Sequence, residues 1–244
     1  MKQKETSYEI IYGIHAIQEC IYAKKRKIYK LYVDSNKQNT MHNILSQVQS
    51  YTAVSLVKKN FLDQISHFEE HQGIIAYVAP FIYQKELFSY EKNSIILFCD
   101  SIQDTKNLGG LLRSAYCTGI TKIILTIKNS APLSAATSKS SAGLLEHLQI
   151  YKSNNAIDTI SQLKSLGYHI FLAAANGNNI DEIGQIPKPI VIVIGNEHTG
   201  IQKKLFEFGT IISLKQCRSD ISYNASVAGG ILLYHIQFIN INSN

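Results

Sequence analysis

Hydrophobic positions along the first eighty residues follow first a helical spacing and then an alternating one. Ile14, Ile17 and Ile21 recur at the spacing of one helix face, whereas residues 27–33 alternate apolar and polar side chains as a half-buried strand does. The expected elements are a helix at 12–23, a strand at 27–33, a helix at 40–49, a strand at 53–57, a short helix, and a strand at 73–79 that Pro80 ends. The pattern predicts a compact α/β module over residues 1–80.

The second half of the chain carries short, almost wholly apolar runs rich in Ile, Val and Leu. Such runs indicate strands covered on both faces, and helical segments between them indicate a parallel sheet. The expected strands are "SIILFCD" (94–100), "TKIILTI" (121–127), "GYHIFLAAA" (167–175), "PIVIVIG" (189–195) and "GTIISL" (209–214). A segment of mixed character at 81–93 is expected to link the small module to a parallel-sheet domain over 94–244. The predicted fold class is α/β.

The chain is basic, which bears on its partners. It has 24 lysines and arginines against 18 aspartates and glutamates, a formal charge of +6 and a pI near 9.0. Such a balance favours RNA or DNA through release of condensed counterions, although a lysine-rich surface kept for solubility gives the same charge. The run Lys24, Lys25, Arg26 and Lys27 is a candidate for phosphate contacts, and a solvated helix end is the alternative.

The cysteines and the apolar segments bear on the compartment. Cys20, Cys99, Cys117 and Cys217 lie far apart without a C-x-x-C pair, which disfavours a zinc cage and a disulfide framework and indicates reduced thiols in a cytosol. No apolar run approaches the ~18 residues of a membrane span. We therefore expect a soluble, cytoplasmic protein with neither a membrane nor a metal partner.

Candidate chemistry is expected at the carboxyl ends of the parallel strands, where open α/β sheets bind ligands. The first such junction carries Asp104, Asn107, Gly109, Gly110 and Arg113. Asn107 is placed to cap the following helix, and Arg113 shares a helix face with both glycines. Helical side chains lean toward the N-terminus, so the guanidinium should lie over the surface that the glycines leave bare and reach back toward Asn107. This predicts an anion-binding pocket; an arginine paired with Asp104 is the structural alternative.

Two further junctions contribute a glycine-bracketed turn and a helix of small residues. The turn "GNEHTG" places Glu197 between Gly195 and Gly200, and it matches neither a Walker loop nor the G-x-G-x-x-G of a dinucleotide fold. The helix "ASVAGG" follows Ser222 and Asn224, and its small residues favour close packing against another backbone. Polar Asn224 needs a hydrogen-bond partner there. Each signal is weak by itself.

One stretch indicates a different chemistry. The letters "HFEEH" at residues 67–71 match H-x-x-E-H, a zinc signature in which a helix presents both imidazoles to the metal. The strand expected from Gly73 leaves little helix for such a pair. We therefore disfavour a metalloprotease and expect His71 to serve packing or a loop.

With all three junctions in view, the chain resembles the SpoU-type RNA 2′-O-ribose methyltransferases of the SPOUT superfamily. Within them it looks most like the bacterial 23S ribosomal RNA guanosine-2′-O-methyltransferases. Residues 100–115 match D-x-x-x-D-P-x-N-L-G-x-x-x-R-[ST]-A, residues 195–200 match G-x-E-x-x-G, and residues 222–230 match an S-L-N followed by a small-residue helix. "SAGLLEHLQI" (141–150) fits the family's intermediate segment, and "YGIHAIQECI" and "HQGIIAYV" resemble its RNA-binding domain. The resemblance covers nearly the whole chain.

The resemblance implies a fold, a cofactor and a set of site residues. The expected fold is a deep trefoil knot in the C-terminal domain behind an RNA-binding domain at 1–80. The family is dimeric, with its site close to the subunit interface, and it uses S-adenosyl-L-methionine and a structured RNA, with 23S rRNA favoured here. The implied catalytic residues are Arg113, Asn107, Glu197, Ser222 and Asn224, and no metal is implied. The implied cofactor-binding residues are Gly195, Asn196, Gly200, Leu214 and Tyr223.

Three departures from the family pattern qualify these expectations. Thr105 stands where the first motif usually has proline, Lys215 and Gln216 alter an I-S-I-P-M loop, and Tyr223 replaces a leucine beside the adenine. The last two motivate one alternative, a non-catalytic RNA-binding protein that has lost its cofactor. A transfer-RNA ribose methyltransferase of the same family is the second alternative.

The resemblance points to Arg113 as the residue that activates the ribose 2′-hydroxyl. A guanidinium stays protonated at neutral pH and is a poor general base. We therefore expect Arg113 to bind the phosphate beside the target and to stabilise the developing alkoxide, so that the phosphate or a water accepts the proton. The other four polar residues would orient the arginine and the ribose.

Overall fold

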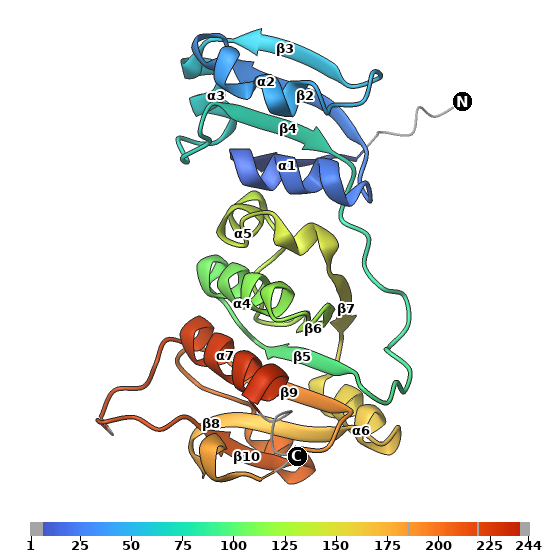
Figure 1. Cartoon of the computed structure of the whole chain (residues 1–244), viewed down its shortest axis with the longest axis vertical. Coiled ribbons are helices and arrows are strands. Elements are labelled where there is room, and N and C mark those ends of the chain that lie inside the picture. Colours follow the sequence, from blue (N-terminus) through green and yellow to red (C-terminus); the bar gives the residue numbers. More distant parts are fainter. Residues whose placement is uncertain (1–6, 185, 219, 240–244) are drawn as a thin grey trace. The chain divides into compact units, whose positions relative to one another are not determined.

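A computed structural model describes residues 7–184, 186–218 and 220–239 of the chain (Figure 1). The chain forms two compact units. The first comprises the chain up to Ile82 together with the segment Pro132–His147, and the second comprises Tyr83–Ala131 and the residues from Leu148 onward. The sequence places one linker, at 81–93, and no shift in composition announces that Pro132–His147 returns to the first unit.

The first unit is built on a mixed sheet with the strand order β1-β4-β2-β3. β4 pairs antiparallel with β1 and β2, and β2 pairs parallel with β3. The strands are β1 (Glu9–Tyr12), β2 (Ile28–Asp34), β3 (Ala53–Val57) and β4 (Ile74–Val78). The helices are α1 (Ile14–Ala23), η1 (Ser35–Lys37), η2 (Asn39–Met41), α2 (His42–Leu45), α3 (Lys59–Ile65), α5 (Ala135–Ser140) and η3 (Leu144–His147). On one face, Leu31 and Val33 join Ile17 of α1 and Ile44 of α2 in an apolar core.

Most of the elements predicted for this unit are confirmed. The expected helix at 40–49 is shorter, because η2 and α2 end at Leu45 and the polar residues 46–50 offer only Val48 to the core. β1 is not predicted from the sequence, since four residues are too few for an alternating pattern to stand out.

The returning segment Pro132–His147 contacts α1 directly. Gly143 has φ +79°, and a Cβ there would lie 2.8 Å from the Ala16 Cα and from the His15 carbonyl oxygen. Only glycine combines this backbone conformation with so close an approach. The His147 ring then lies with its Nε2 2.7 Å from Glu19 Oε2. Most of the connection between β6 (Lys122–Thr126) and β7 (Gln149–Ser153) therefore belongs to the first unit.

Arg26 lies inside the first unit and not at its surface. Its guanidinium donates to Glu146 Oε1 at 2.9 Å and to Glu9 Oε2 at 2.6 Å, and its Nε donates to the Ala79 carbonyl at 2.6 Å. The side chains of Arg26 and Glu146 are 3% and 1% exposed. The prediction that Arg26 contacts phosphate is therefore wrong, because its charge is already paired within the fold. For its three lysine neighbours it stays a prediction.

The second unit is built on a parallel sheet, as predicted, with the strand order β10-β8-β9-β5-β6-β7. Its strands are β5 (Ile95–Asp100), β6 (Lys122–Thr126), β7 (Gln149–Ser153), β8 (His169–Asn179), β9 (Ile190–Gly195) and β10 (Thr210–Ser213). Its helices are α4 (Thr105–Cys117), α6 (Ala156–Ser165), η4 (Ile180–Glu182), η5 (Lys203–Phe208), α7 (Ala225–Tyr234) and η6 (His235–Ile239). β7 is not among the strands predicted from the sequence, because its first residues end the segment "SAGLLEHLQI". Strand order alone does not show threading, so the knot stays a prediction.

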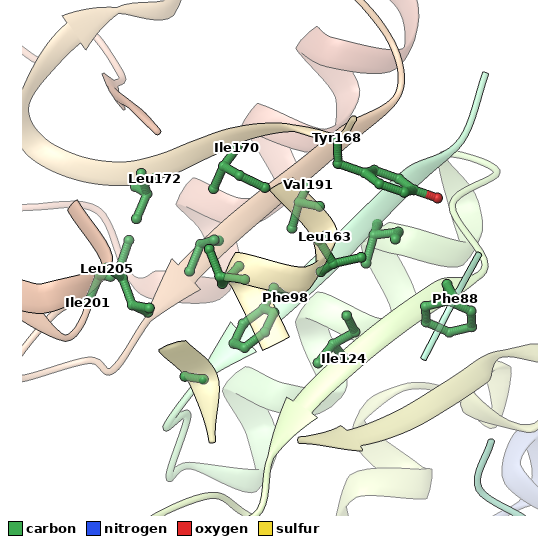
Figure 2. Close-up of a cluster of buried hydrophobic side chains, with 14 residues drawn as sticks. Phe88, Phe98, Ile124, Leu163, Tyr168, Ile170, Leu172, Val191, Ile201 and Leu205 are labelled. Carbon is green, nitrogen blue, oxygen red and sulfur yellow. The ribbon is translucent and has the colours of Figure 1, made fainter. Parts of the chain in front are cut away.

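Both faces of this sheet are covered. Figure 2 shows the core on one face, where Phe98 of β5, Val191 of β9 and Leu163 of α6 belong to one buried cluster. Strand residues alternate between faces, so the fully buried Leu97 and Ile192 point to the other side, where α7 packs against β9. Burial on both faces explains why these strands are almost wholly apolar.

The "HFEEH" stretch does not present a histidine pair to a metal. The Nδ1 of buried His71 accepts from the Gly73 N–H at 2.9 Å, so its Nε2 carries the proton and donates to Asp63 Oδ1 at 3.0 Å. His67, in contrast, is exposed. No cluster of His, Cys, Asp and Glu that could hold a metal ion occurs among the described residues. None of the described helices is long and apolar enough to cross a membrane. All four cysteines are free.

Candidate active site

Two of the three sequence junctions meet at the carboxyl edge of the second unit's sheet. β5 and β9 are parallel neighbours, and their last residues, Asp100 and Gly195, lie in register. The loops that follow them touch, since Asn196 Nδ2 donates to the Ser101 carbonyl at 2.8 Å. The carboxyl ends of two central strands thus build the site, as expected for an open parallel sheet.

One polar residue from each motif joins a hydrogen-bonded chain that also brings in the third junction. Asn107 Nδ2 donates to Glu197 Oε1 at 3.0 Å, and Asn107 Oδ1 accepts from Asn224 Nδ2 at 2.9 Å. Asn224 Oδ1 in turn accepts from the backbone N–H of Ser226 at 2.9 Å and so caps α7. These hydrogen bonds provide the partner that Asn224 needs. They also hold together α4, the turn after β9 and the start of α7.

The cap of α4 is Asp104, so the prediction that Asn107 caps this helix is wrong. Asp104 Oδ1 accepts from the backbone N–H groups of Lys106 at 2.6 Å and Asn107 at 3.2 Å. A carboxylate satisfies these free donors and also complements the helix dipole. With the cap provided by Asp104, the Asn107 side chain is available to Glu197.

Glu197 is surrounded by donors. Besides Asn107, the backbone N–H groups of Gln103 and Asp104 each donate to its carboxylate at 3.3 Å. Burial by itself would raise the pKa of this carboxyl, but the hydrogen bonds from Asn107 and from the backbone together lower the pKa below its usual 4.5. Glu197 is therefore ionised at neutral pH and suited to positioning its neighbours.

We expect acid to weaken the fold through Glu197. Because its pKa in the folded state lies below the unfolded value, this stabilisation is complete above about pH 4.5 and is lost as the pH falls through the folded pKa. The Glu197→Gln variant lacks this acid-sensitive contribution. The difference in free energy of unfolding between the wild type and the variant should therefore be constant near neutral pH and become smaller in acid. Denaturant unfolding at a series of pH values measures this difference. An advantage that is the same in acid and at neutrality contradicts the expectation.

Asp100 and Gln202 support the site through hydrogen bonds, and neither is among the residues predicted from the sequence to form it. Asp100 is fully buried, and its two carboxylate oxygens accept from Gln202 Nε2 at 2.7 Å and from the Gln202 N–H at 3.0 Å. The signal was present: Asp100 is an acid at the end of an otherwise apolar strand, and a buried charge requires partners. This pair fixes the residues that follow the turn after β9.

Gly195 is required by the way this turn closes. Asn196 and Gly200 exchange backbone hydrogen bonds of 3.0 and 2.9 Å. A Cβ on Gly195 would lie 2.4 Å from the carbonyl carbon of Gly200 and from the nitrogen of Ile201, which leaves no room for a side chain. Asn196 Oδ1 also accepts from the backbone N–H groups of His198 and Thr199, at 2.9 and 3.0 Å. Both polar ends of the Asn196 side chain are thus used inside the fold.

A cavity of about 600 Å³ lies beside the hydrogen-bonded chain. The turn after β9, the loop after β10 and the start of α7 line it. All five residues predicted to bind a cofactor line this cavity: Gly195, Asn196, Gly200, Leu214 and Tyr223. Of the predicted catalytic residues, Glu197, Ser222 and Asn224 line it and Asn107 and Arg113 do not. Its size is typical of small-molecule sites.

The glycines of α4 serve helix packing. A Cβ on Gly110 would lie 3.0 Å from the Cβ of Ser226, and one on Gly229 would lie 2.2 Å from Leu111 Cδ2. α4 and α7 therefore cross where their side chains are small. The prediction that Arg113 lies over a gap left by the glycines is wrong, because α7 occupies the space at Gly110.

Arg113 is exposed on α4. Within the described part of the chain it has no hydrogen bond or ion pair, either to Asn107 or to Asp104, which is occupied as the helix cap. The other two arginines differ, because Arg26 and Arg218 both hold carboxylates. Arg113 is thus the arginine whose charge is available to a ligand.

Comparison with known families explains why these three junctions occur together. Residues 94–234, more than half of the chain, match the model of the SpoU rRNA Methylase family. Residues 10–84 match that of the RNA 2′-O ribose methyltransferase substrate-binding domain. The chain belongs to the SpoU rRNA methylase family. The resemblance read from the motifs is therefore confirmed, and every polar SpoU motif residue that it named is present.

Individual SpoU relatives match nearly the whole chain. The 23S rRNA (guanosine-2′-O-)-methyltransferase RlmB of Haemophilus ducreyi is 29% identical over 241 residues, covering 93% of this chain and 96% of its own. A Staphylococcus saprophyticus protein, provisionally described as a TrmH family tRNA/rRNA methyltransferase, is 29% identical over 235 residues, covering 93% and 94%. The SpoU methyltransferase AviRb of Streptomyces viridochromogenes, solved in complex with AdoMet, shares the fold with a TM-score of 0.79 at 19% identity, covering 97% and 92%.

The departures from the SpoU pattern fall into two groups. Thr105, in place of the motif's proline, is the first residue of α4, where proline is favoured because its missing N–H would have no helical partner. Threonine at that position costs little. Gln216 and Tyr223 line the cavity, and the Tyr223 hydroxyl donates to the Lys215 carbonyl at 3.5 Å. The departures at Lys215, Gln216 and Tyr223 therefore lie together at the wall of the cavity.

Proposed function

We propose that this SpoU protein transfers a methyl group from S-adenosyl-L-methionine to a ribose 2′-hydroxyl of RNA. The convergence of Asn107, Glu197 and Asn224 beside a cavity of about 600 Å³ carries this proposal. The substrate-binding match over residues 10–84 supports RNA as the substrate. The presence of AdoMet in AviRb, whose fold the chain shares, supports the cofactor.

The cavity fits a cofactor of this kind. Its volume lies inside the range of about 300–1,000 Å³ that is usual for ligand sites, and its lining combines apolar residues such as Leu214 and Leu232 with polar ones such as Asn196 and Ser222. Leu214 and Tyr223 would hold the adenine, and the backbone of Gly195 would hold its polar edge. The bound cofactor supplies an electrophilic methyl group on a sulfonium. Calorimetry with S-adenosyl-L-methionine tests this step alone.

Arg113 would bind the phosphate beside the target ribose and stabilise the oxygen that becomes negative. A residue that meets RNA from outside must be exposed and free of internal ion pairs, and among the described residues Arg113 meets both conditions. It follows Asn107 by six residues on α4, about 9 Å along the axis, and helical side chains lean back toward the N-terminus. The proton would pass to the phosphate or to a water.

Asn107, Glu197 and Asn224 would position the reacting groups. The low pKa of Glu197 keeps it an acceptor of hydrogen bonds and disfavours it as a proton acceptor at neutral pH. Ser222 is exposed and lines the cavity, which suits its hydroxyl to the ribose. In this arrangement the chain's residues align the sugar for in-line attack.

We further propose a guanosine of 23S rRNA as the target. The nearly full-length match to RlmB, whose name describes it as a 23S rRNA (guanosine-2′-O-)-methyltransferase, supports this choice. The tRNA/rRNA description of the staphylococcal relative keeps transfer RNA as the alternative substrate. The intact chain of Asn107, Glu197 and Asn224 disfavours the non-catalytic alternative.

Mapping ribose methylation in RNA from cells with and without the gene tests the target. Loss of one 2′-O-methyl group from 23S rRNA is the expected result. Loss from transfer RNA would move the target to the alternative substrate. Unchanged methylation of both RNAs, together with no binding of S-adenosyl-L-methionine, would overturn the enzymatic proposal. The cytoplasmic location that the sequence suggests fits either RNA and stays a prediction.

We also propose that two copies pair through α7 and η6. Val227, Ile231, Tyr234 and Phe238 are 49%, 43%, 55% and 43% exposed, and their spacing places them along one stripe. A continuous apolar stripe of this kind marks an interaction site. In Ile231→Lys, sedimentation should show a monomer where the wild type sediments as a dimer. A wild type that is monomeric throughout contradicts this pairing.

A further inference from the structure

The first unit carries a row of aromatic side chains on one face of its sheet. Tyr8, Tyr77, Tyr32 and Phe61 follow one another with ring-centroid distances of 4.8, 5.7 and 5.1 Å. They come from the residue before β1, from β4, from β2 and from α3. Neighbouring rings are tilted or set edge to face, as aromatic pairs prefer. We call these four residues the aromatic row.

The aromatic row lies on the sheet face opposite α1 and α2. On β2, Tyr32 alternates with Leu31 and Val33, which point into the core that those helices cover. The ends of the row reach the surface, since Tyr8 is 57% and Phe61 is 41% exposed. Exposed rings at both ends of a linked row offer stacking surfaces to a ligand.

Positive charge accompanies these rings. Lys30 Nζ lies 4.6 Å from the centroid of the Tyr32 ring. Lys27, just before the same strand, lies beside two rings outside the aromatic row, with its Nζ 5.0 Å from the centroid of Tyr51 and 5.5 Å from that of Tyr29. Neither lysine has a carboxylate partner within the described part of the chain. Their charges therefore remain available to an anion.

Aromatic rings beside unpaired lysines suit single-stranded nucleic acid. Unpaired bases stack on Tyr and Phe rings that stand on a sheet face, and lysines neutralise the adjoining phosphates. Bases inside a duplex hide their faces from such rings. We propose that the aromatic row binds unpaired bases of the RNA substrate, in a loop, bulge or end. This proposal rests on the proposed function, because the RNA that the aromatic row binds is taken to be the RNA that the protein methylates.

The test compares RNA affinities of the full chain and of Tyr8→Ala. Fluorescence anisotropy is measured with a labelled uridine oligomer of about 12 nucleotides and with a mixed-sequence RNA duplex of about the same length. Loss of one stacking ring should weaken binding of the oligomer about 5-fold to 100-fold. Binding of the duplex, which depends on phosphates, should change less than about twofold. Tyr8→Phe keeps the ring and should bind the oligomer like the wild type.

Tyr22→Ala is the matched control. Tyr22 is 48% exposed, but it stands on α1, which covers the opposite face of the sheet. Its substitution should leave both affinities unchanged. Phe61→Ala is a second variant on the aromatic row and should behave like Tyr8→Ala. Circular dichroism and the affinity for S-adenosyl-L-methionine show that each variant is folded.

Three results would overturn the proposal. The first is unchanged affinity of Tyr8→Ala and Phe61→Ala for the oligomer, and the second is an equal loss on the duplex. The third is a changed oligomeric state with unchanged RNA affinity, which would make the row a contact between copies. Failure of the proposed function would look different: the wild type would bind the oligomer through the row and yet methylate no cellular RNA.

Discussion

Replacing Arg113 with lysine is expected to slow RNA methylation by about 10²–10³-fold, the loss that follows removal of one donor from a stabilised oxyanion. Lysine keeps the positive charge. Its ammonium group is a compact point charge, however, whereas the planar guanidinium can hold a phosphate oxygen and the developing alkoxide together. The measurement is single-turnover transfer of a labelled methyl group to ribosomal RNA from cells that lack the gene.

Two controls separate a catalytic loss from a binding loss. Arg113→Lys should bind S-adenosyl-L-methionine as the wild type does, because Arg113 does not line the cavity. Arg218→Lys is the matched variant, since Arg218 is also exposed but pairs with Asp220. It should methylate RNA at close to the wild-type rate. If Arg113→Lys does the same, Arg113 has no part in the chemistry.

Replacing Arg26 with alanine is expected to lower the free energy of unfolding by about 3–5 kcal/mol, the cost of leaving one partner of a buried ion pair alone. Glu146 is 1% exposed, and its Oε2 already has no hydrogen-bond partner in the described structure. Burial raises the pKa of Glu146, and Arg26 is the main influence that lowers it. Without the arginine, Glu146 must take up a proton or remain a buried charge. Denaturant unfolding measures the loss.

The chain offers a matched control for this change too. Arg218→Ala removes an ion pair whose side chains are 68% and 59% exposed, so it should leave the free energy of unfolding almost unchanged. The double variant Arg26→Met with Glu146→Leu should recover much of the loss, because apolar residues can replace a buried pair. An Arg26→Ala protein as stable as Arg218→Ala would show that the buried pair contributes little.

The candidate site shows which of its features follow from the sequence. All five predicted cofactor residues line one cavity, although the turn after β9 and the loop before α7 are far apart in the chain. Each motif stands directly after a strand or before a helix, and parallel strands deliver their carboxyl ends to one edge. The sequence did not correctly predict which residues at this edge of the sheet form hydrogen bonds with one another. Asp104 and not Asn107 caps α4, because the helix begins at Thr105 and places Asn107 inside its first turn, where its side chain reaches Glu197.

The sequence by itself determined the parallel sheet, the order of the motifs and the family. Strands buried on both faces must be continuously apolar, and motif residues keep their spacing along the chain, so both features are local. Only the tertiary structure decided which residues meet across long separations. Gly110 faces Ser226, Arg26 is buried against Glu146, and Pro132–His147 returns to the first unit. These pairings depend on how chain segments close on one another in space, and a local pattern of polar and apolar residues does not encode that.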